Sequence, residues 1–260
     1  MVAPTYKRPL PLRGLNAIGY GLEKLGIQYP NLEEERFIRE AQRVTGLDDF
    51  GSETFREGMQ QLLRALEKDG KLNLVGRFMT QETLGGYLEN RLRMHDERKR
   101  RPEIANSEVR SPLIIAGLPR TGTTILFNLL SMDPVNRAPM GWELEKPFPV
   151  PEPETRLSNP QIAATQKRFD TLYKIAPQLA SIHMFGALLP QECVAIMAHE
   201  FMSVQFHVIY NVPTYQAWLD QQSHIQTLQY HRSFLQFLQS RYPTERWLLK
   251  TPGFLSILDE

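Results

Sequence analysis

The sequence of 260 residues contains a single cysteine, Cys193, so no disulfide can form within the chain. Disulfides persist in oxidising compartments, and this composition therefore favours a reducing, cytoplasmic location. The amino terminus carries charges and prolines where a signal peptide needs an apolar stretch. No uninterrupted apolar run reaches the roughly 20 residues that cross a bilayer. We expect an intracellular protein with no integral membrane segment.

A strong excess of one charge sign is also absent. Thirty lysine and arginine residues stand against 29 aspartate and glutamate residues, which gives a net charge of +1. No global field then attracts nucleic acid, and an anionic ligand must be bound by local groups. The one dense basic run, Arg-Lys-Arg-Arg at 98–101, is interpreted as a solvated helix end. We expect no nucleic-acid partner.

Helical periodicity dominates residues 15–97, where apolar side chains recur at the spacing of one helix face. Two such stripes are Phe55, Met59, Leu62, Leu63 and Leu66, and Leu84, Leu88 and Leu92. We predict a helical amino-terminal region over residues 1–110. Residues 111–260 are predicted to form the first part of an α/β domain, with a helical insertion at about 155–242. The amphipathic stretch 15–27 is expected to pack against the domain rather than lie on a membrane.

Two short apolar runs are typical of buried parallel strands, one at residues 112–116 and one at 247–249. A helix is predicted over 123–132, and a weak third strand near 139–141. The order strand, helix, long helical insertion, strand predicts an α/β fold with a P-loop-like parallel sheet flanked by helices.

The segment 117–124, Gly-Leu-Pro-Arg-Thr-Gly-Thr-Thr, lies between the first predicted strand and the helix that follows it. The first backbone N–H groups of a helix have no partner inside the helix, and the helix dipole is positive there. A phosphate at this point gains several hydrogen bonds at once. Gly122 lets the backbone approach the anion closely, and Thr123 and Thr124 add hydroxyl groups. The segment predicts a phosphate-binding loop.

A nucleotide kinase or ATPase loop has a lysine directly after its second glycine. Here Thr123 occupies that position, and without the lysine a γ-phosphate loses its main point charge. The basic residue lies inside the loop instead, at Arg120. That placement suits a nucleotide with only a 5′-phosphosulfate to hold.

The loop resembles the 5′-phosphosulfate-binding loop of sulfotransferases that use 3′-phosphoadenosine 5′-phosphosulfate (PAPS), in which Pro-Lys/Arg-Ser/Thr-Gly-Thr-Thr is usual. It is most similar to the mainly bacterial branch with an arginine in the loop and a helical amino-terminal domain. The segments 90–92, 137–143 and 247–252 also resemble that branch. The resemblance implies a PAPS-dependent sulfotransferase with PAPS as co-substrate. The implied cofactor-binding residues are Pro119, Arg120, Thr121, Gly122, Thr123 and Thr124.

Lys250 follows three apolar residues and precedes Thr251, a preferred N-cap, and Pro252, a preferred first helical residue. A helix is therefore predicted to begin here, with Lys250 at the carboxyl edge of its strand. Ligands of open α/β sheets bind at that edge, so Arg120 and Lys250 can meet one sulfate. Many sulfotransferases carry a histidine base where this sequence has Pro252, so the base is unassigned.

Sulfuryl transfer to a hydroxyl group needs a base within hydrogen-bond reach. The candidate catalytic residues are Arg120 for the leaving phosphate oxygen, Lys250 for the sulfuryl group, and His183, Glu192 or Glu143 for the base. His183 ranks slightly first because its ordinary pKa lies in a useful range. Glu192 follows Pro190 at a predicted helix start and is equally explained as a helix-start carboxylate.

The acceptor is expected to be a small molecule with an apolar body, such as a lipid, sterol-like or phenolic hydroxyl compound. Seven residues are candidates for its pocket, although an aromatic stripe at helical spacing is more often core: Met184, Phe185, Phe201, Phe206, Tyr210, Tyr215 and Trp218. No metal site is predicted, because His199-Glu200 lacks a second histidine and His224 and His231 lie too far apart.

In the family, a strand with an arginine and a helix with a serine follow and bind the 3′-phosphate. No such elements follow Lys250 before the sequence stops at Glu260, so we expect a carboxyl-terminally truncated chain. Two alternatives stay open. A P-loop kinase or NTPase with a degenerate loop would bind ATP with magnesium, and an inactive fragment would act only as a binding module.

Overall fold

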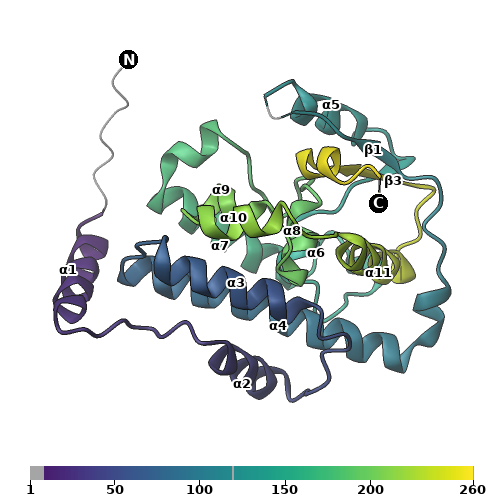
Figure 1. Ribbon diagram of the computed structural model, residues 1–260. Helices are drawn as coiled ribbons and strands as arrows, with labels where there is room; N and C mark the ends of the chain where they lie inside the picture. The colour runs from purple at the N-terminus through teal and green to yellow at the C-terminus, as the bar shows by residue number, and fades with distance from the viewer. Residues whose placement is uncertain (1–8, 119, 260) are drawn as a thin grey trace.

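In the described part of the chain, four α-helices and one 3₁₀ helix precede the first strand (Figure 1). The computed structural model describes residues 9–118 and 120–259. The four helices are α1 (Leu10–Lys24), α2 (Glu34–Thr45), α3 (Phe55–Lys68) and α4 (Leu74–Arg100). Gly46 ends α2 in the left-handed conformation, and the Asn73 side chain caps α4 by accepting from the N–H of Gly76.

Both predicted apolar stripes are buried in one core, which confirms the periodicity found in the sequence. The stripe of α3 and the stripe of α4 pack together with Phe201, Phe206 and Tyr215 from the helical segment after β2. The amino-terminal helices are therefore joined to the rest of the protein by a shared apolar core.

The strands described within residues 9–118 and 120–259 form one parallel sheet in the order β1–β3–β2. They are β1 (Leu113–Ile115), β2 (Asn136–Arg137) and β3 (Arg246–Lys250). Ile115 pairs with Lys250 across β1 and β3. The predicted α/β fold with a parallel sheet is confirmed. The third strand lies a few residues before its predicted place, and Met140 instead makes an isolated antiparallel bridge to Pro190.

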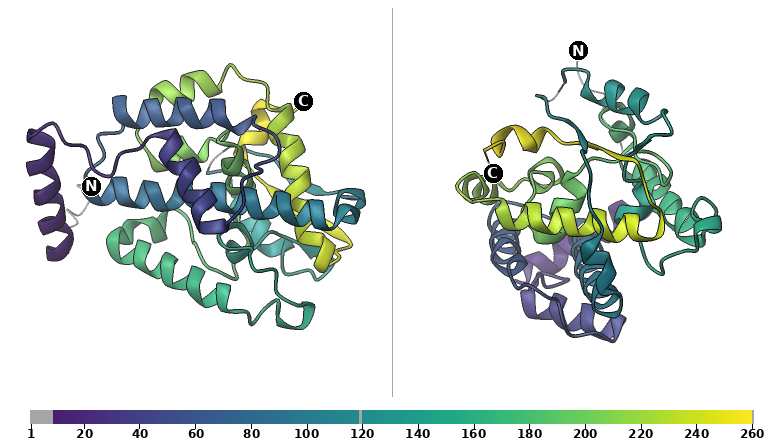
Figure 2. Two further views of the ribbon diagram at one scale, coloured as in Figure 1. Left: turned by 90° about the horizontal axis from the view of Figure 1, so that it is seen from below. Right: turned by 90° about the vertical axis from the view of Figure 1, so that its right-hand side faces the viewer.

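Helices cover the two faces of β3 (Figure 2). Trp247 and Leu249 pack into the cluster of α11 (Ile225–Arg241), whereas Leu248 packs with Phe127 of α5 (Thr123–Leu130). Successive side chains of a strand point to opposite faces. Lys250 therefore points to the same face as Leu248, toward α5.

Ten further helices, most of them short, lie in the rest of the described chain. They are η1 (Pro102–Asn106), α6 (Gly141–Glu145), η2 (Pro153–Thr155), α7 (Pro160–Ile175), η3 (Pro177–Ser181), α8 (Val194–Met197), η4 (Ala198–Glu200), α9 (Gln205–Ile209), α10 (Pro213–Leu219) and η5 (Pro252–Ser256). The helix predicted after Lys250 is η5, a 3₁₀ helix rather than an α-helix. Its N-cap is Thr251, whose hydroxyl accepts from the N–H of Gly253, as the sequence predicts. Over the described ranges, no helix is both long and apolar enough to span a membrane.

Candidate functional site

The loop between β1 and α5 lies at the carboxyl edge of the sheet. Gly122 is the N-cap of α5 and has a φ of 88°, a conformation that residues with a Cβ rarely adopt. The hydroxyl of Thr121 donates to the carbonyl of Leu118 at 2.7 Å and closes the loop on itself. The loop therefore presents the amino end of α5 to the space beyond the sheet. Pro119 lies outside the described residues.

Arg120 is exposed and has a φ of 68°, so the backbone turns sharply on both sides of Thr121. Non-glycine residues rarely occupy this left-handed region, and such strain clusters at ligand sites. The guanidinium group is accessible to an anion at the loop.

Lys250 links the end of β3 to the loop. Its Nζ donates to Thr124 Oγ1 at 2.8 Å and to Glu192 Oε1 at 2.5 Å. The side chain is only 3% exposed. A buried ammonium group needs such partners to offset its desolvation, and both partners lie at the carboxyl edge of the sheet. Two segments far apart in the sequence, the loop and Lys250, are thus in contact.

His183 and Glu192 lie beside this lysine. Glu192 Oε1 is 3.8 Å from His183 Nδ1, while the other ring nitrogen of His183 is 3.3 Å from Gln191 Oε1. The N–H of Cys193 donates to the carbonyl of Lys250 at 2.9 Å and fixes this segment to the end of β3. The structure therefore brings together four of the residues selected from the sequence: Thr124, His183, Glu192 and Lys250.

Gln191 is a site residue that the sequence analysis missed. Its backbone N–H donates to the carbonyl of Pro139 at 2.8 Å, and its side chain faces His183. No motif includes it, and its contact depends on a bend of the chain between residues 183 and 191. The one feature of the sequence that points to Gln191 as a site residue is its position directly before Glu192.

Glu143 is not available as a base, contrary to the candidate list drawn from the sequence. Its side chain is fully buried and accepts from Arg137 at 2.8 Å and from Arg156 at 3.0 Å. Burial opposes its ionisation, but Arg137 and Arg156 outweigh that effect and lower its pKa. Glu143 is therefore a structural carboxylate that no acceptor can reach.

The proposed aromatic pocket is wrong for three of its members. Phe201, Phe206 and Tyr215 are completely buried in the core shared with α3 and α4. They pack edge to face or stacked against one another, and no surface remains for an acceptor. Met184 is exposed, and Phe185 lies against the ring of His183 with 4.6 Å between centroids. Phe185 thus contacts a candidate catalytic residue, whereas Tyr210 and Trp218 pack against the core of α3 and α4.

His199 is a core residue. Its Nδ1 lies 3.0 Å from the carbonyl of Ala195, and its Nε2 lies 3.3 Å from the amide nitrogen of Asn90. Its neighbour Glu200 forms a buried ion pair with Arg91. Within the part of the chain that is described, no cluster of three or more metal-ligating side chains occurs.

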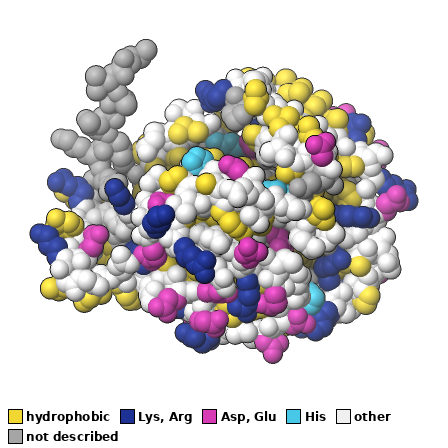
Figure 3. All heavy atoms as spheres, viewed as in Figure 1, with side chains coloured by type: hydrophobic (Ala, Val, Ile, Leu, Met, Phe, Trp, Pro, Cys, Tyr) yellow, Lys and Arg dark blue, Asp and Glu magenta, His cyan; other side chains and the backbone are white. Residues whose placement is uncertain are grey.

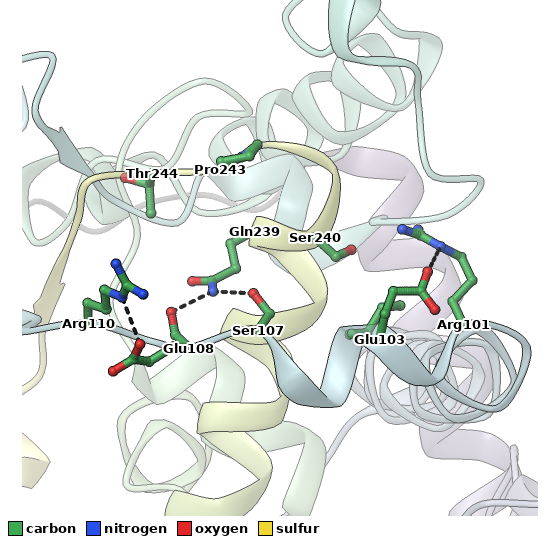
Figure 4. Close-up of a pocket in the computed structure, with 10 residues that line it drawn as sticks. Arg101, Glu103, Ser107, Glu108, Arg110, Gln239, Ser240, Pro243 and Thr244 are labelled. Carbon is green, nitrogen blue, oxygen red and sulfur yellow. Dashed lines mark hydrogen bonds and ion pairs between the residues drawn. The ribbon is translucent and has the colours of Figure 1, made fainter.

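A cavity of about 400 Å³ opens at the opposite edge of the sheet (Figure 4). Arg110 precedes β1 and Thr244 precedes β3, so the cavity lies at the amino ends of the strands. Its polar groups are paired with one another: Arg110 with Glu108, and Gln239 with Ser107. Ligands of parallel sheets bind at the other edge, so this cavity is not the candidate site.

Comparisons with known proteins identify the family of the chain. The model of the sulfotransferase family matches residues 112–260. The structure is similar to sulfotransferase STF1 from Mycobacterium tuberculosis H37Rv, with 31% identity, a TM-score of 0.77, and coverage of 87% of this chain and 63% of that one. It is also similar to sulfotransferase STF9 from Mycobacterium avium, with 25% identity, a TM-score of 0.78, and coverage of 90% and 61%.

The chain spans 63% and 61% of the length of these two solved relatives. No curated protein matches the sequence significantly. The family match begins at β1 and includes the loop, Glu192 and Lys250. The chain belongs to the sulfotransferase family.

Proposed function

We propose that this protein transfers the sulfuryl group of PAPS to the hydroxyl group of a small, apolar acceptor. The observation that carries the proposal is the contact between Lys250 and Thr124 at 2.8 Å. It joins the two segments that resemble the donor-binding elements of the family. A phosphosulfate at the amino end of α5 would lie between the loop and a buried cation.

The loop and the two cations would each contact a different part of the negatively charged donor. Backbone N–H groups at residues 122–124 and the hydroxyls of Thr123 and Thr124 would bind the 5′-phosphate. Arg120 is permanently charged and would stabilise the leaving phosphate oxygen. Lys250 would stabilise the sulfuryl group during its transfer, as cations do in phosphoryl transfer. In this scheme Lys250 exchanges its contact with Glu192 for the sulfuryl oxygens.

His183 is the base that the geometry favours. If Nε2 carries the ring proton and donates to Gln191, Nδ1 keeps its lone pair on the side of Glu192. Nδ1 would take the acceptor's hydroxyl proton, while the acceptor oxygen forms its bond to sulfur. The bond from sulfur to the 5′-phosphate oxygen breaks, and adenosine 3′,5′-bisphosphate leaves. Glu192 would then stabilise the imidazolium ion.

Calorimetry tests the donor assignment. Adenosine 3′,5′-bisphosphate should bind without metal and at least about tenfold more tightly than ATP, a difference of about 1.4 kcal/mol. Lys250→Ala should weaken the binding of PAPS, whose sulfuryl group we assign to this lysine, more than the binding of adenosine 3′,5′-bisphosphate. Lys99→Ala, which removes a surface lysine, should leave both unchanged. Binding of ATP alone, dependent on magnesium, would instead favour a kinase or NTPase.

A transfer assay tests the reaction itself. PAPS is offered together with phenolic, sterol and lipid hydroxyl compounds, and the sulfated product is measured. The proposal expects product with at least one apolar hydroxyl acceptor, and the reaction should need His183. Sulfation restricted to charged, fully polar acceptors would contradict the proposed acceptor class.

A further inference from the structure

Helix α1 projects from the molecule at the end farthest from α5 (Figures 1 and 2). It is attached along one side only. The Asn16 side chain accepts from the N–H of Val75 at 3.2 Å, and the backbone of Gly19 lies directly against Leu74. None of the residues of α1 is buried. The expectation that this stretch packs against the domain is therefore confirmed for one side of α1, which lies along α4, whereas the opposite side is exposed.

The free side of α1 is apolar. Leu10, Ile18 and Leu25 are 76%, 61% and 75% exposed, and Leu15 is half-exposed on the same side. Leu10, Ile18 and Leu25, the C-cap of α1, lie within about 80° of one another around the helix axis and form one stripe, and Leu15 lies at its edge beside Ile18. A soluble helix normally turns such a stripe toward its own core, and here it faces outward.

Basic residues flank this stripe. Arg13 and Lys24 are both exposed, and the Lys24 Nζ lies 4.7 Å from the ring centroid of Tyr20. Figure 3 shows basic and apolar side chains next to each other on this projecting helix. An aromatic ring and a lysine at the edge of an apolar stripe suit the boundary between lipid headgroups and acyl chains.

The charge of the chain is unevenly distributed. Residues 1–27 contain four basic residues and one acidic residue, a net charge of +3, whereas the whole chain carries +1. The remainder therefore carries −2. An anionic surface would attract the amino-terminal segment and not the protein as a whole. A second copy of α1 would bring like charges together, which disfavours self-association through this helix.

We propose that the exposed stripe of α1 (Leu10, Leu15, Ile18 and Leu25) and its basic flanks bind an anionic phospholipid surface. The apolar side chains would enter the boundary of the bilayer, while Arg13 and Lys24 would contact the headgroups. Because α1 lies far from α5, this contact would hold the protein at the surface and leave the phosphate loop accessible.

The test is cosedimentation of the chain with lipid vesicles. Vesicles of phosphatidylcholine with about one third phosphatidylserine should bind the protein, and about 0.5 M salt should weaken binding strongly, since the Debye length then falls below about 5 Å. Pure phosphatidylcholine vesicles should bind it far less. The double variant Ile18→Ser with Leu25→Ser should lower binding at least about tenfold.

Ile125→Ser is the matched control, because Ile125 is an exposed isoleucine on another helix, α5. It should bind vesicles like the unaltered chain, and circular dichroism should show equal helix content in all variants. Failure to bind anionic vesicles would overturn the proposal, as would an equal loss in the Ile125→Ser control. A dimer that the double variant converts to a monomer would show that a second copy covers α1, and would also overturn it.

Discussion

The Nζ of Lys250 lies 2.5 Å from Oε1 of Glu192. The same carboxylate oxygen is within 4 Å of His183 Nδ1. One carboxylate therefore sits between the cation that we assign to the sulfuryl group and the base that we assign to the acceptor. An anionic donor must compete with Glu192 for Lys250.

Glu192→Gln should raise the affinity for adenosine 3′,5′-bisphosphate at least about threefold, because it removes a competing negative charge close to the anion. It should also slow sulfuryl transfer, since the imidazolium form of His183 loses its nearby carboxylate. His183→Gln should leave the affinity unchanged and abolish transfer. Calorimetry and single-turnover kinetics measure the two effects. Transfer that survives in His183→Gln but not in Glu192→Gln would make Glu192 the base.

Arg120→Ala should abolish sulfuryl transfer, whereas Arg120→Lys should keep a measurable part of it. The proposed role needs positive charge more than a planar guanidinium group. Arg110→Ala is a suitable control, because Arg110 is an exposed arginine at the opposite edge of the sheet. Equal single-turnover rates for Arg120→Ala and the unaltered chain would refute the role of Arg120.

Gly122→Val should remove binding of adenosine 3′,5′-bisphosphate with little change in helix content. An added Cβ meets no protein atom within 4 Å, so its effect comes from the φ of 88° and from the space left for the phosphate. Gly46→Val is matched to it, with a φ of 71° and equally open surroundings at the end of α2.

Both substitutions should lower the free energy of unfolding by about 1–2 kcal/mol, because both force a branched residue into the left-handed region. Only Gly122→Val should affect nucleotide binding, measured by calorimetry. If the two variants bind the nucleotide equally well, the loop does not hold the 5′-phosphate.

Acid should destabilise the protein through two buried histidines. Burial lowers the pKa of His199 and of His231 to about 4, from an ordinary value of 6.5. Between these values the unfolded chain binds more protons than the folded chain, so stability falls as the pH falls from 6.5 to 4. At pH 5 the loss is about 2 kcal/mol for each histidine.

His231→Leu isolates one of these contributions. Urea unfolding at pH 7 and pH 5 should show a drop in stability that is smaller in this variant than in the unaltered chain, by about 2 kcal/mol. An identical drop in both would mean that His231 is already charged in the folded protein or that other groups cause the acid sensitivity.

The local elements of the site follow from the sequence. The loop could be predicted because a strand, a glycine-containing turn and a helix start lie next to each other, and Lys250 because a cap motif follows a buried strand. The contact between Lys250 and Glu192 could not be predicted from the sequence. It depends on the bond from Cys193 to the backbone of Lys250, which joins segments 57 residues apart by a single N–H donor.

The structure also shows which aromatic residues are buried, a question that the periodicity of the sequence leaves open. The aromatic residues Phe201, Phe206 and Tyr215 have the same pattern whether they line a pocket or fill a core. They are core residues because α3 and α4 supply the apolar surface that covers them. Conversely, α1 has an amphipathic pattern and nothing in the sequence reveals that its apolar side faces away from the domain.

The parallel pairing of β1 with β3 has a consequence for the order of folding. The strands adjoin in the sheet, yet α5 to α11 all lie between them in the chain. The whole helical segment must be synthesised before Lys250 exists and can contact Thr124. Pairing over such a sequence separation is slow, because the closing loop loses its entropy before the contacts form. During synthesis the phosphate loop is therefore made long before its lysine, and the contact between them forms later than the amino-terminal helical core.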